Sequence, residues 1–317
     1  MKKTILATLI LILIYNNTYS KPYPISPRPL RKLVIESNAI IVGNVIKVYK
    51  SGSQDTENKK SKKKKKRTYE SSYSIAMIVI KETLQGKISK DTIEISFEPN
   101  MICPSPARYF ENTTVLAFLD DNNGQYSTHA LSYGAKTLDT TGIRIYKDRI
   151  KEIQTILKDK ESSTQQSETI EWLVKCAENP ITRWEGIFEL SPESNFMFFY
   201  SKEHNDTFKD YLNEQQKARL KKALELSSNF DYYDFGLSDL IYLDNQKEID
   251  ALLLEKLKKL TSENYWYASD FMIRLKHLKD SAEMENLLKK QSEIELTYNN
   301  DSERKKIIDD FISLVEH

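Results

Sequence analysis

The chain has 317 residues, of which 39% are hydrophobic and 29% are charged, and its formal net charge is +1. This length has room for two domains of ordinary size, and an aromatic content of 10% indicates packed cores rather than a disordered chain. With only 8 glycines, the composition excludes a glycine-rich phosphate-binding protein.

The first twenty residues have the pattern of a secretory signal peptide. Two lysines precede an apolar run at 4–15, and the small residues Thr18 and Ser20 fit cleavage after Ser20. The run is short for a membrane span, although an uncleaved N-terminal anchor is the alternative interpretation. We therefore expect export to a periplasm or beyond, with no transmembrane span in the mature chain.

Strand signals follow a proline-rich leader at 21–36, which ends in a short helix or turn. Runs rich in β-branched residues, or with alternating apolar residues, predict strands at 39–49, 72–81, 92–97, 114–119, 126–131 and 141–146. Gly43 is expected to form a bulge or a bend, and Asn122, Asn123 and Gly124 a hairpin turn. Five or six short strands with this spacing predict a small antiparallel barrel at 37–158, closed by a helix near Ile150.

A dense basic run lies in a predicted polar loop, 50–71, between the first two strands. Its members are Lys59, Lys60, Lys62, Lys63, Lys64, Lys65, Lys66 and Arg67. One interpretation is docking on a polyanion such as lipopolysaccharide, an acidic polysaccharide or an anionic lipid. Another is a solvated loop, because so many like charges repel each other. A third is contact with the acidic half of the same chain, and export makes nucleic acid an unexpected partner.

The two halves of the chain differ in charge. Residues 21–160 contain 25 basic and 15 acidic side chains, a net of +10, whereas residues 161–317 contain 20 and 31, a net of −11. After a polar linker, the second half has the 3.6-residue apolar period of helices. We expect an all-α domain at 168–317, either a HEAT-like array or an irregular helical bundle, and thus an α+β two-domain protein.

Three segments of the first half carry a resemblance to a known family. They are "SNAIIVGNVIKV" at 37–48, "YSIAMIVIKETLQGKISKDTIEISF" at 73–97 and "MICPSPARYFENTTVLAFL" at 101–119. This order of strands and turns resembles the tissue-inhibitor-of-metalloproteinases and netrin-like OB-fold domains, in their small secreted bacterial form. The resemblance implies an OB-like barrel. It implies no protease inhibition, because the mature start at Lys21 lacks the cysteine with which inhibitor members bind the protease zinc.

No motif for catalysis, a cofactor or a metal stands out. His204 lies between acidic residues but has no partner at a useful spacing, and His129 and His277 fit structural positions. Asp120 and Asp121 precede two asparagines, yet they lack the spacing of a calcium loop. Cys103 and Cys176 could form a disulfide between the domains or remain free thiols.

Aromatic residues of the second half allow two interpretations. The sets Trp172 with Trp184, and Tyr265 with Trp266 and Tyr267, could stack on a carbohydrate or partner, or pack in the helical core. Together these patterns favour an exported, non-catalytic binding or scaffolding protein of the cell envelope with a protein or glycan partner. The alternative is an envelope hydrolase whose active site is assembled from distant residues.

Overall fold

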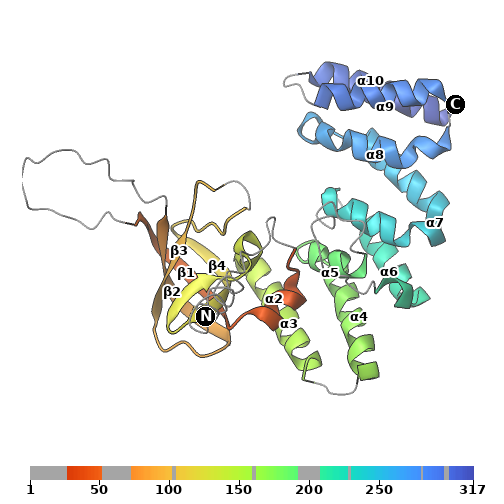
Figure 1. Ribbon diagram of the computed structural model, residues 1–317. Helices are drawn as coiled ribbons and strands as arrows, with labels where there is room; N and C mark the ends of the chain where they lie inside the picture. Colours follow the sequence, from red (N-terminus) through yellow and green to blue (C-terminus); the bar gives the residue numbers. More distant parts are fainter. Residues whose placement is uncertain are drawn as a thin grey trace, which may run out of the picture. The chain divides into compact units, whose positions relative to one another are not determined.

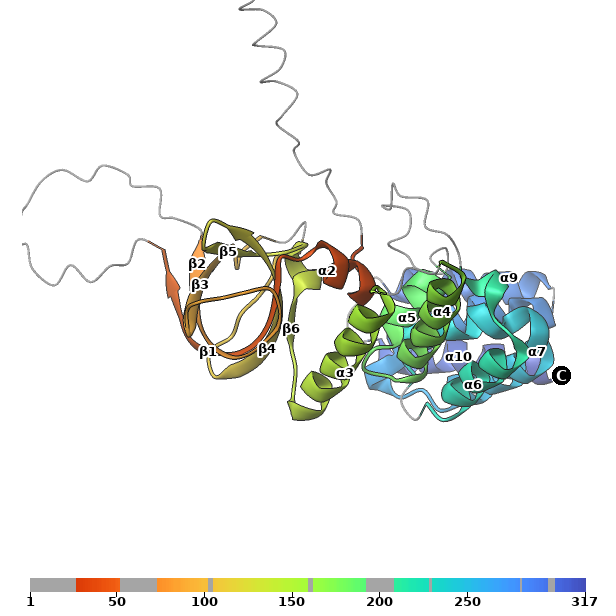
Figure 2. The same cartoon turned by 90° about the horizontal axis from the view of Figure 1, so that it is seen from below.

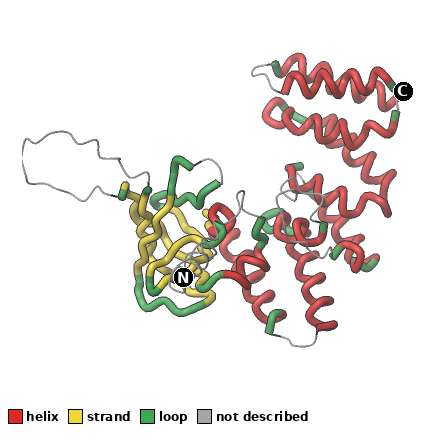
Figure 3. The backbone as a smooth tube through the Cα atoms, viewed as in Figure 1, coloured by secondary structure: helices red, strands yellow, loops and turns green. Residues whose placement is uncertain are grey.

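The computed structural model describes residues 27–51, 73–101, 105–158, 162–191, 208–227, 230–279, 281–295 and 300–317. Two compact units divide the chain between Thr155 and Ile156. Strands belong to the first unit, and the second unit is helical (Figures 1 and 3). The expected α+β organisation is therefore confirmed.

The first unit is built on a six-stranded antiparallel sheet. Its strands are β1 (Ala39–Lys50), β2 (Ser74–Gln85), β3 (Thr92–Phe97), β4 (Thr113–Asn122), β5 (Gln125–Thr128) and β6 (Ala135–Thr137). The order is β3-β2-β1-β4-β5, and β6 pairs with β4. The sheet is curled (Figure 2), but no ladder joins β3 to β5 in the described residues. It is therefore an open sheet, and the expected closed barrel is not formed by hydrogen bonds.

Alternation of side chains explains how the sheet forms its core. In β3, Ile93, Ile95 and Phe97 are buried, whereas the residues between them are exposed. They join apolar residues of β1, β2 and β4 in one continuous cluster. The β1–β2 register shifts between Val42 and Gly43, where the pairing passes over Lys81 of β2, so the sheet is irregular beside Gly43.

This unit also contains two helices. In sequence, α2 (Leu30–Glu36) precedes the strands and α3 (Thr140–Ile156) follows them. The predicted strand at 141–146 is wrong, because these residues form the first turns of α3. Asp139 accepts a hydrogen bond from the backbone N–H of Gly142 at 2.7 Å. The buried face of α3 contains Tyr146, Ile150 and Ile153, at helical spacing. The capping carboxylate and this period outweigh the strand preference of the β-branched residues.

The second unit contains helices that pack mainly on their neighbours in sequence. They are α4 (Ser162–Glu178), α5 (Arg183–Leu190), α6 (Glu214–Glu225), α7 (Tyr232–Lys258), α8 (Ala268–Leu275), α9 (Ala282–Glu295) and α10 (Asp301–Glu316). Short 3-10 segments, η4 (Lys209–Tyr211), η5 (Ser262–Tyr267) and η6 (Lys276–Leu278), connect some of them. The expected linker is shorter than predicted, since α4 begins at Ser162.

Helix α7 is kinked at Asn245, whose backbone φ of −139° is not helical. Before the kink the helix buries Phe235 and Ile241, and after it Ile249 and Leu253. Among the described residues, no helix has both the length and the apolar character that a membrane span requires.

Candidate functional site

Strands β2 and β3 present a second face, opposite the core, that is partly apolar. Ala76 and Ile78 of β2 point into the core, so Ile75 and Met77 point to the other side, where both are half-buried. The register places Ile75 between Tyr49 of β1 and Ser96 of β3. Met77 lies in the next row, opposite Glu94. This face therefore offers two apolar side chains within a polar frame.

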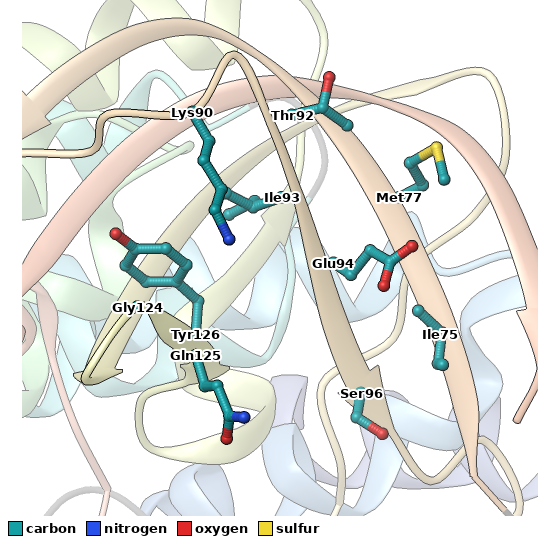
Figure 4. Close-up of a pocket in the computed structure, with 10 residues that line it drawn as sticks. All are labelled: Ile75, Met77, Lys90, Thr92, Ile93, Glu94, Ser96, Gly124, Gln125 and Tyr126. Carbon is teal, nitrogen blue, oxygen red and sulfur yellow. The ribbon is translucent and has the colours of Figure 1, made fainter.

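A groove of about 510 Å³ lies where this face meets β5. It is lined by Ile75, Met77, Lys90, Thr92, Ile93, Glu94, Ser96, Gly124, Gln125 and Tyr126. Figure 4 shows the β3 ribbon passing between two groups of these side chains. Lys90, Ile93 and Tyr126 lie on one side of the ribbon, and Met77 and Glu94 lie on the other. The volume is within the range of ligand-binding clefts.

Charged groups at the groove are few. The Tyr49 hydroxyl donates a hydrogen bond to Glu94 Oε1 at 2.7 Å, and this bond raises the pKa of Tyr49. The Lys47 ammonium lies 5.5 Å from the centre of the Tyr49 ring, within cation–π range. Burial, followed by the charge of Asp121, raises the pKa of Tyr126. The lining is therefore amphipathic rather than strongly charged.

The turn between β4 and β5 closes one end of the groove. Asn123 and Gly124 have φ values of 56° and 82°, the left-handed conformation of a tight hairpin turn. The Gly124 backbone N–H donates to Asp121 Oδ1 at 2.7 Å. The predicted hairpin turn is thus confirmed. Among the described residues, no group of three or more metal-binding side chains is assembled.

The predicted polyanion-binding residues, Lys59 to Arg67, lie outside the described part of the chain. The structure does place the ends of their connection. Lys50 is the last residue of β1 and pairs with Ser74, the first residue of β2. Ile75, which lines the groove, is the next residue. The basic run therefore belongs to a connection that leaves the sheet beside the groove, and its role stays a prediction.

In both His129 and His277, each ring nitrogen lies within hydrogen-bond distance of another protein group. His129 Nδ1 lies 2.8 Å from Asp120 Oδ1, and its Nε2 lies 3.0 Å from Glu36 Oε2. Carboxylates only accept hydrogen bonds, so this geometry fits a protonated ring that donates to both. The bond to Glu36 is the main reason that the pKa of His129 is raised, with a further contribution from Asp120. His129 is thus a link between α2 and β4.

His277 is exposed beside a hollow of about 440 Å³ in the helical unit, and both of its ring nitrogens also have partners. Its Nδ1 lies 2.8 Å from the Arg274 carbonyl oxygen, and its Nε2 lies 2.9 Å from Asp250 Oδ2. The Tyr242 hydroxyl lies 3.1 Å from the same Nε2. Neither His129 nor His277 therefore offers a free nitrogen to a substrate. His204 lies outside the described residues.

The cysteine and aromatic predictions have different outcomes. Cys176 is buried in α4, but Cys103 lies outside the described residues, so their pairing stays a prediction. Trp172, Tyr265 and Tyr267 are buried in the helical core. Trp184 is half-buried and packs on Phe188 with ring centres 5.5 Å apart. Trp266 is the member of these sets that is mainly exposed, at 54%.

Sequence reasoning did not single out the groove. Alternation in 72–81 places Tyr73, Ile75 and Met77 on one face, which is the available signal. The contribution of Lys90 and Tyr126 depends on the sheet register and curl, which join residues distant in sequence. Comparison with known proteins adds no assignment, since no family model, no curated protein and no solved structure matches the chain.

Proposed function

We propose that this chain is an exported, non-catalytic binding or scaffolding protein of the cell envelope. Its ligand, a protein or a glycan, occupies the groove on the outer face of β2 and β3. The observation that carries the proposal is the groove itself, in which half-buried Ile75 and Met77 lie beside Thr92, Ser96 and other hydrogen-bonding groups. Apolar surface with a few placed polar groups is the usual composition of a binding site.

An OB-like interpretation of the sheet supports this location. OB folds are partly open five-stranded barrels that bind ligands on strands 2 and 3, framed by the loops between strands 1 and 2 and between strands 4 and 5. Here the groove lies on β2 and β3, and the β4–β5 turn lines it. The resemblance of 37–48, 73–97 and 101–119 to netrin-like domains agrees with this interpretation. Because a fold does not fix a function, the groove remains the main argument.

The basic run Lys59 to Arg67 would assist binding when the ligand is anionic. Its connection leaves the sheet at Lys50 and returns at Ser74, at one end of the groove. A cationic segment in this place would increase the local concentration of a polyanion by long-range attraction. The helical unit would then serve as a scaffold, through a HEAT-like concave surface or an irregular bundle.

An envelope hydrolase is the weaker alternative. General acid–base catalysis needs a side chain within hydrogen-bond reach of the reacting proton. Both ring nitrogens of His129 and of His277 already contact protein groups. Among the described residues that line the groove, the one carboxylate is Glu94, which accepts a hydrogen bond from Tyr49. A binding role needs no such free acid–base group.

The test is capture of envelope glycans and proteins by the mature protein and by two matched variants. Met77→Glu places a charge in the groove, whereas Ile46→Glu places the same charge at an exposed position of β1, outside the lining. We expect Met77→Glu to lose the captured ligand and Ile46→Glu to retain it. Equal capture by both variants would contradict a role for the groove.

A variant without residues 52–68, measured at low and high salt, separates the basic run from the groove. An electrostatic role predicts that the deletion weakens capture at low salt and has little effect at high salt. Equal capture with and without the segment at both salt concentrations would show that the basic run is dispensable.

A further inference from the structure

Strands β3 and β5 both have an unpaired side at the groove. Among the described residues, β3 pairs only with β2, and β5 pairs only with β4. Alternate residues of such an edge strand point their backbone N–H and C=O groups away from the sheet. Cα atoms of β3 lie within 8 Å of Cα atoms of β5. Two rows of backbone donors and acceptors therefore face each other across the groove.

The edge of β3 has few of the usual features that prevent strand addition. Charged side chains, proline and bulges normally protect such edges. The sequence of β3, TIEISF, contains no proline, and its register with β2 is regular from Thr92 to Phe97. Its one charged side chain, Glu94, is bonded to Tyr49. This edge is thus suited to pair with another extended segment.

The side chains around the edge indicate which segment would fit. Half-buried Tyr126 offers an apolar contact on one side of β3, where the Lys90 ammonium also lies (Figure 4). Lys90 is the cation among the ten described lining residues, and no carboxylate among the described residues forms an ion pair with it within 4.0 Å. An acidic side chain on the bound segment would therefore complement it.

We propose that the groove takes an extended polypeptide segment, which adds as a strand along β3 with an acidic side chain against Lys90. This inference rests on the proposed binding function and names its partner. Backbone hydrogen bonds would give affinity, and the alternate side chains would give specificity. A strand added to β3 lies about 4.8 Å from it. Because Cα atoms of β5 lie within 8 Å of Cα atoms of β3, β5 must move aside on binding. Four residue pairs hold β5 to β4, which makes β5 the strand that yields.

The experiment measures binding of a short fluorescent peptide that begins with glutamate and then alternates valine and threonine. Two N-methylated forms block backbone N–H groups on one edge or on the other. Strand addition predicts that one form binds as the parent does and that the other does not bind. Equal binding of both forms would overturn the proposal. Protection from hydrogen exchange, without peptide, of the β3 amides that point away from β2 would also overturn it, because that edge would then already be paired.

Charge variants test the position of Lys90. Lys90→Glu should weaken binding of the peptide by about fivefold, the effect of a partly exposed ion pair. Lys87→Glu makes the same charge change at an exposed residue before the strand, outside the lining, and should bind as wild type. A peptide with lysine in place of glutamate should show the reverse preference between wild type and Lys90→Glu. An equal effect of the two substitutions would contradict the proposed register.

A second binding experiment uses an acidic oligosaccharide in place of the peptide. It separates the proposed binding function of the groove from the proposed strand addition along β3. If it binds and is lost in Met77→Glu while the peptide does not bind, the strand inference is wrong and the binding function stands. If neither probe binds and Met77→Glu leaves envelope capture unchanged, both proposals are wrong. Peptide binding that one N-methylated form loses supports both.

Discussion

The two units of the molecule place their charges in opposite ways. In the described part of the sheet unit, the buried polar side chains are Ser37 and Ser74, and the ionised groups lie at the rim. In the helical unit, the charged residues Arg183, Glu185, Glu189, Asp234 and Asp250 are all at most 5% exposed. Apolar packing therefore dominates the first core, whereas the second core also contains buried charges, among them the ion pair of Arg183 with Asp234.

The difference concerns how each unit responds to substitution and to pH. An apolar core loses stability gradually, in proportion to the removed volume. A buried charge whose partner is removed is strongly unfavourable, because it can regain neither its partner nor water. The helical unit should therefore respond sharply to single polar substitutions, and the sheet unit mainly at its charged rim.

The largest effect is expected from the pair Arg183 and Asp234. The Arg183 guanidinium donates to Asp234, which also accepts from Ser227 at 3.0 Å. Burial raises the pKa of Asp234 more strongly than Arg183 lowers it. Asp234→Ala leaves Arg183 buried without this carboxylate and should lower the free energy of unfolding by about 3–5 kcal/mol. Urea denaturation followed by circular dichroism at helical wavelengths measures the loss.

A double variant shows whether the loss comes from the orphaned charge. Replacing the pair by apolar residues, Arg183→Met with Asp234→Leu, should restore most of the stability, since buried ion pairs add little over good apolar packing. If the double variant is as unstable as Asp234→Ala, the hydrogen bonds of the pair are themselves essential.

The second effect concerns the rim of the sheet unit, where His129 links Glu36 and Asp120. The raised pKa of His129 means that its contribution is complete below the ordinary value of 6.5 and is lost as pH rises through the folded value. Burial raises the pKa of Glu36, but the bonds from His129 and Arg28 outweigh it and leave it lowered. The Glu36 contribution is thus present above 4.5 and is lost as pH falls.

The directions of these two pKa shifts predict that the contact of His129 with Glu36 is most stable between about pH 4.5 and pH 6.5. His129→Gln should lower the free energy of unfolding by about 1 kcal/mol in this window and by less at pH 9, because the ring loses its proton as pH rises through the folded pKa. Hydrogen exchange of α2 and β4 amides at the two pH values provides the measurement. A loss of equal size at both values would show that the ring acts by packing rather than by charge.

A third effect on stability, comparable in size to that of His129→Gln, is expected at the start of α6. The Asn213 side chain accepts a hydrogen bond from the Gln216 backbone N–H at 2.9 Å, and the Gln216 side chain accepts from the Asn213 N–H. Asn213→Ala removes the first bond and should lower stability by about 1 kcal/mol. Thermal unfolding measures the change. Asn213→Asp is the matched control and should retain nearly all of the stability.

The smallest effect is expected from an exposed ion pair on α10. Lys305 Nζ lies 2.8 Å from Asp309 Oδ2 on the helix surface. Lys305→Ala should change the free energy of unfolding by about 0.3–0.5 kcal/mol, and high salt should remove the difference. A change of the size expected for Asp234→Ala would break the proposed distinction between buried and rim charges.

Local patterns explain which elements the sequence could predict. The strict alternation of 92–97 predicted β3 with its observed bounds. The cap of α6 at Asn213 and the kink of α7 at Asn245 are also local features of the chain. The strand predicted at 141–146 failed because a carboxylate cap and the apolar period of a longer helix decide that segment.

The groove could not be predicted because no local pattern encodes it. Ile75 and Ser96 become neighbours through the β2–β3 register, and Tyr126 joins them through the curl of the whole sheet. The link between Glu36 and His129 likewise joins residues 93 positions apart. Such contacts depend on the packing of distant segments, whereas a single sequence reveals mainly local periods, caps and turns.

The Asn123–Gly124 turn has a consequence for the ageing of the protein. Asparagine is thermolabile, and it deamidates most readily before glycine, when the glycine nitrogen attacks the side-chain carbonyl. In the folded hairpin the Gly124 N–H is held by the Asp121 carboxylate, which disfavours loss of its proton. Deamidation thus proceeds chiefly when the hairpin opens. The fraction of aspartate and isoaspartate that accumulates at position 123 would record how often this end of the groove has opened during the lifetime of a molecule.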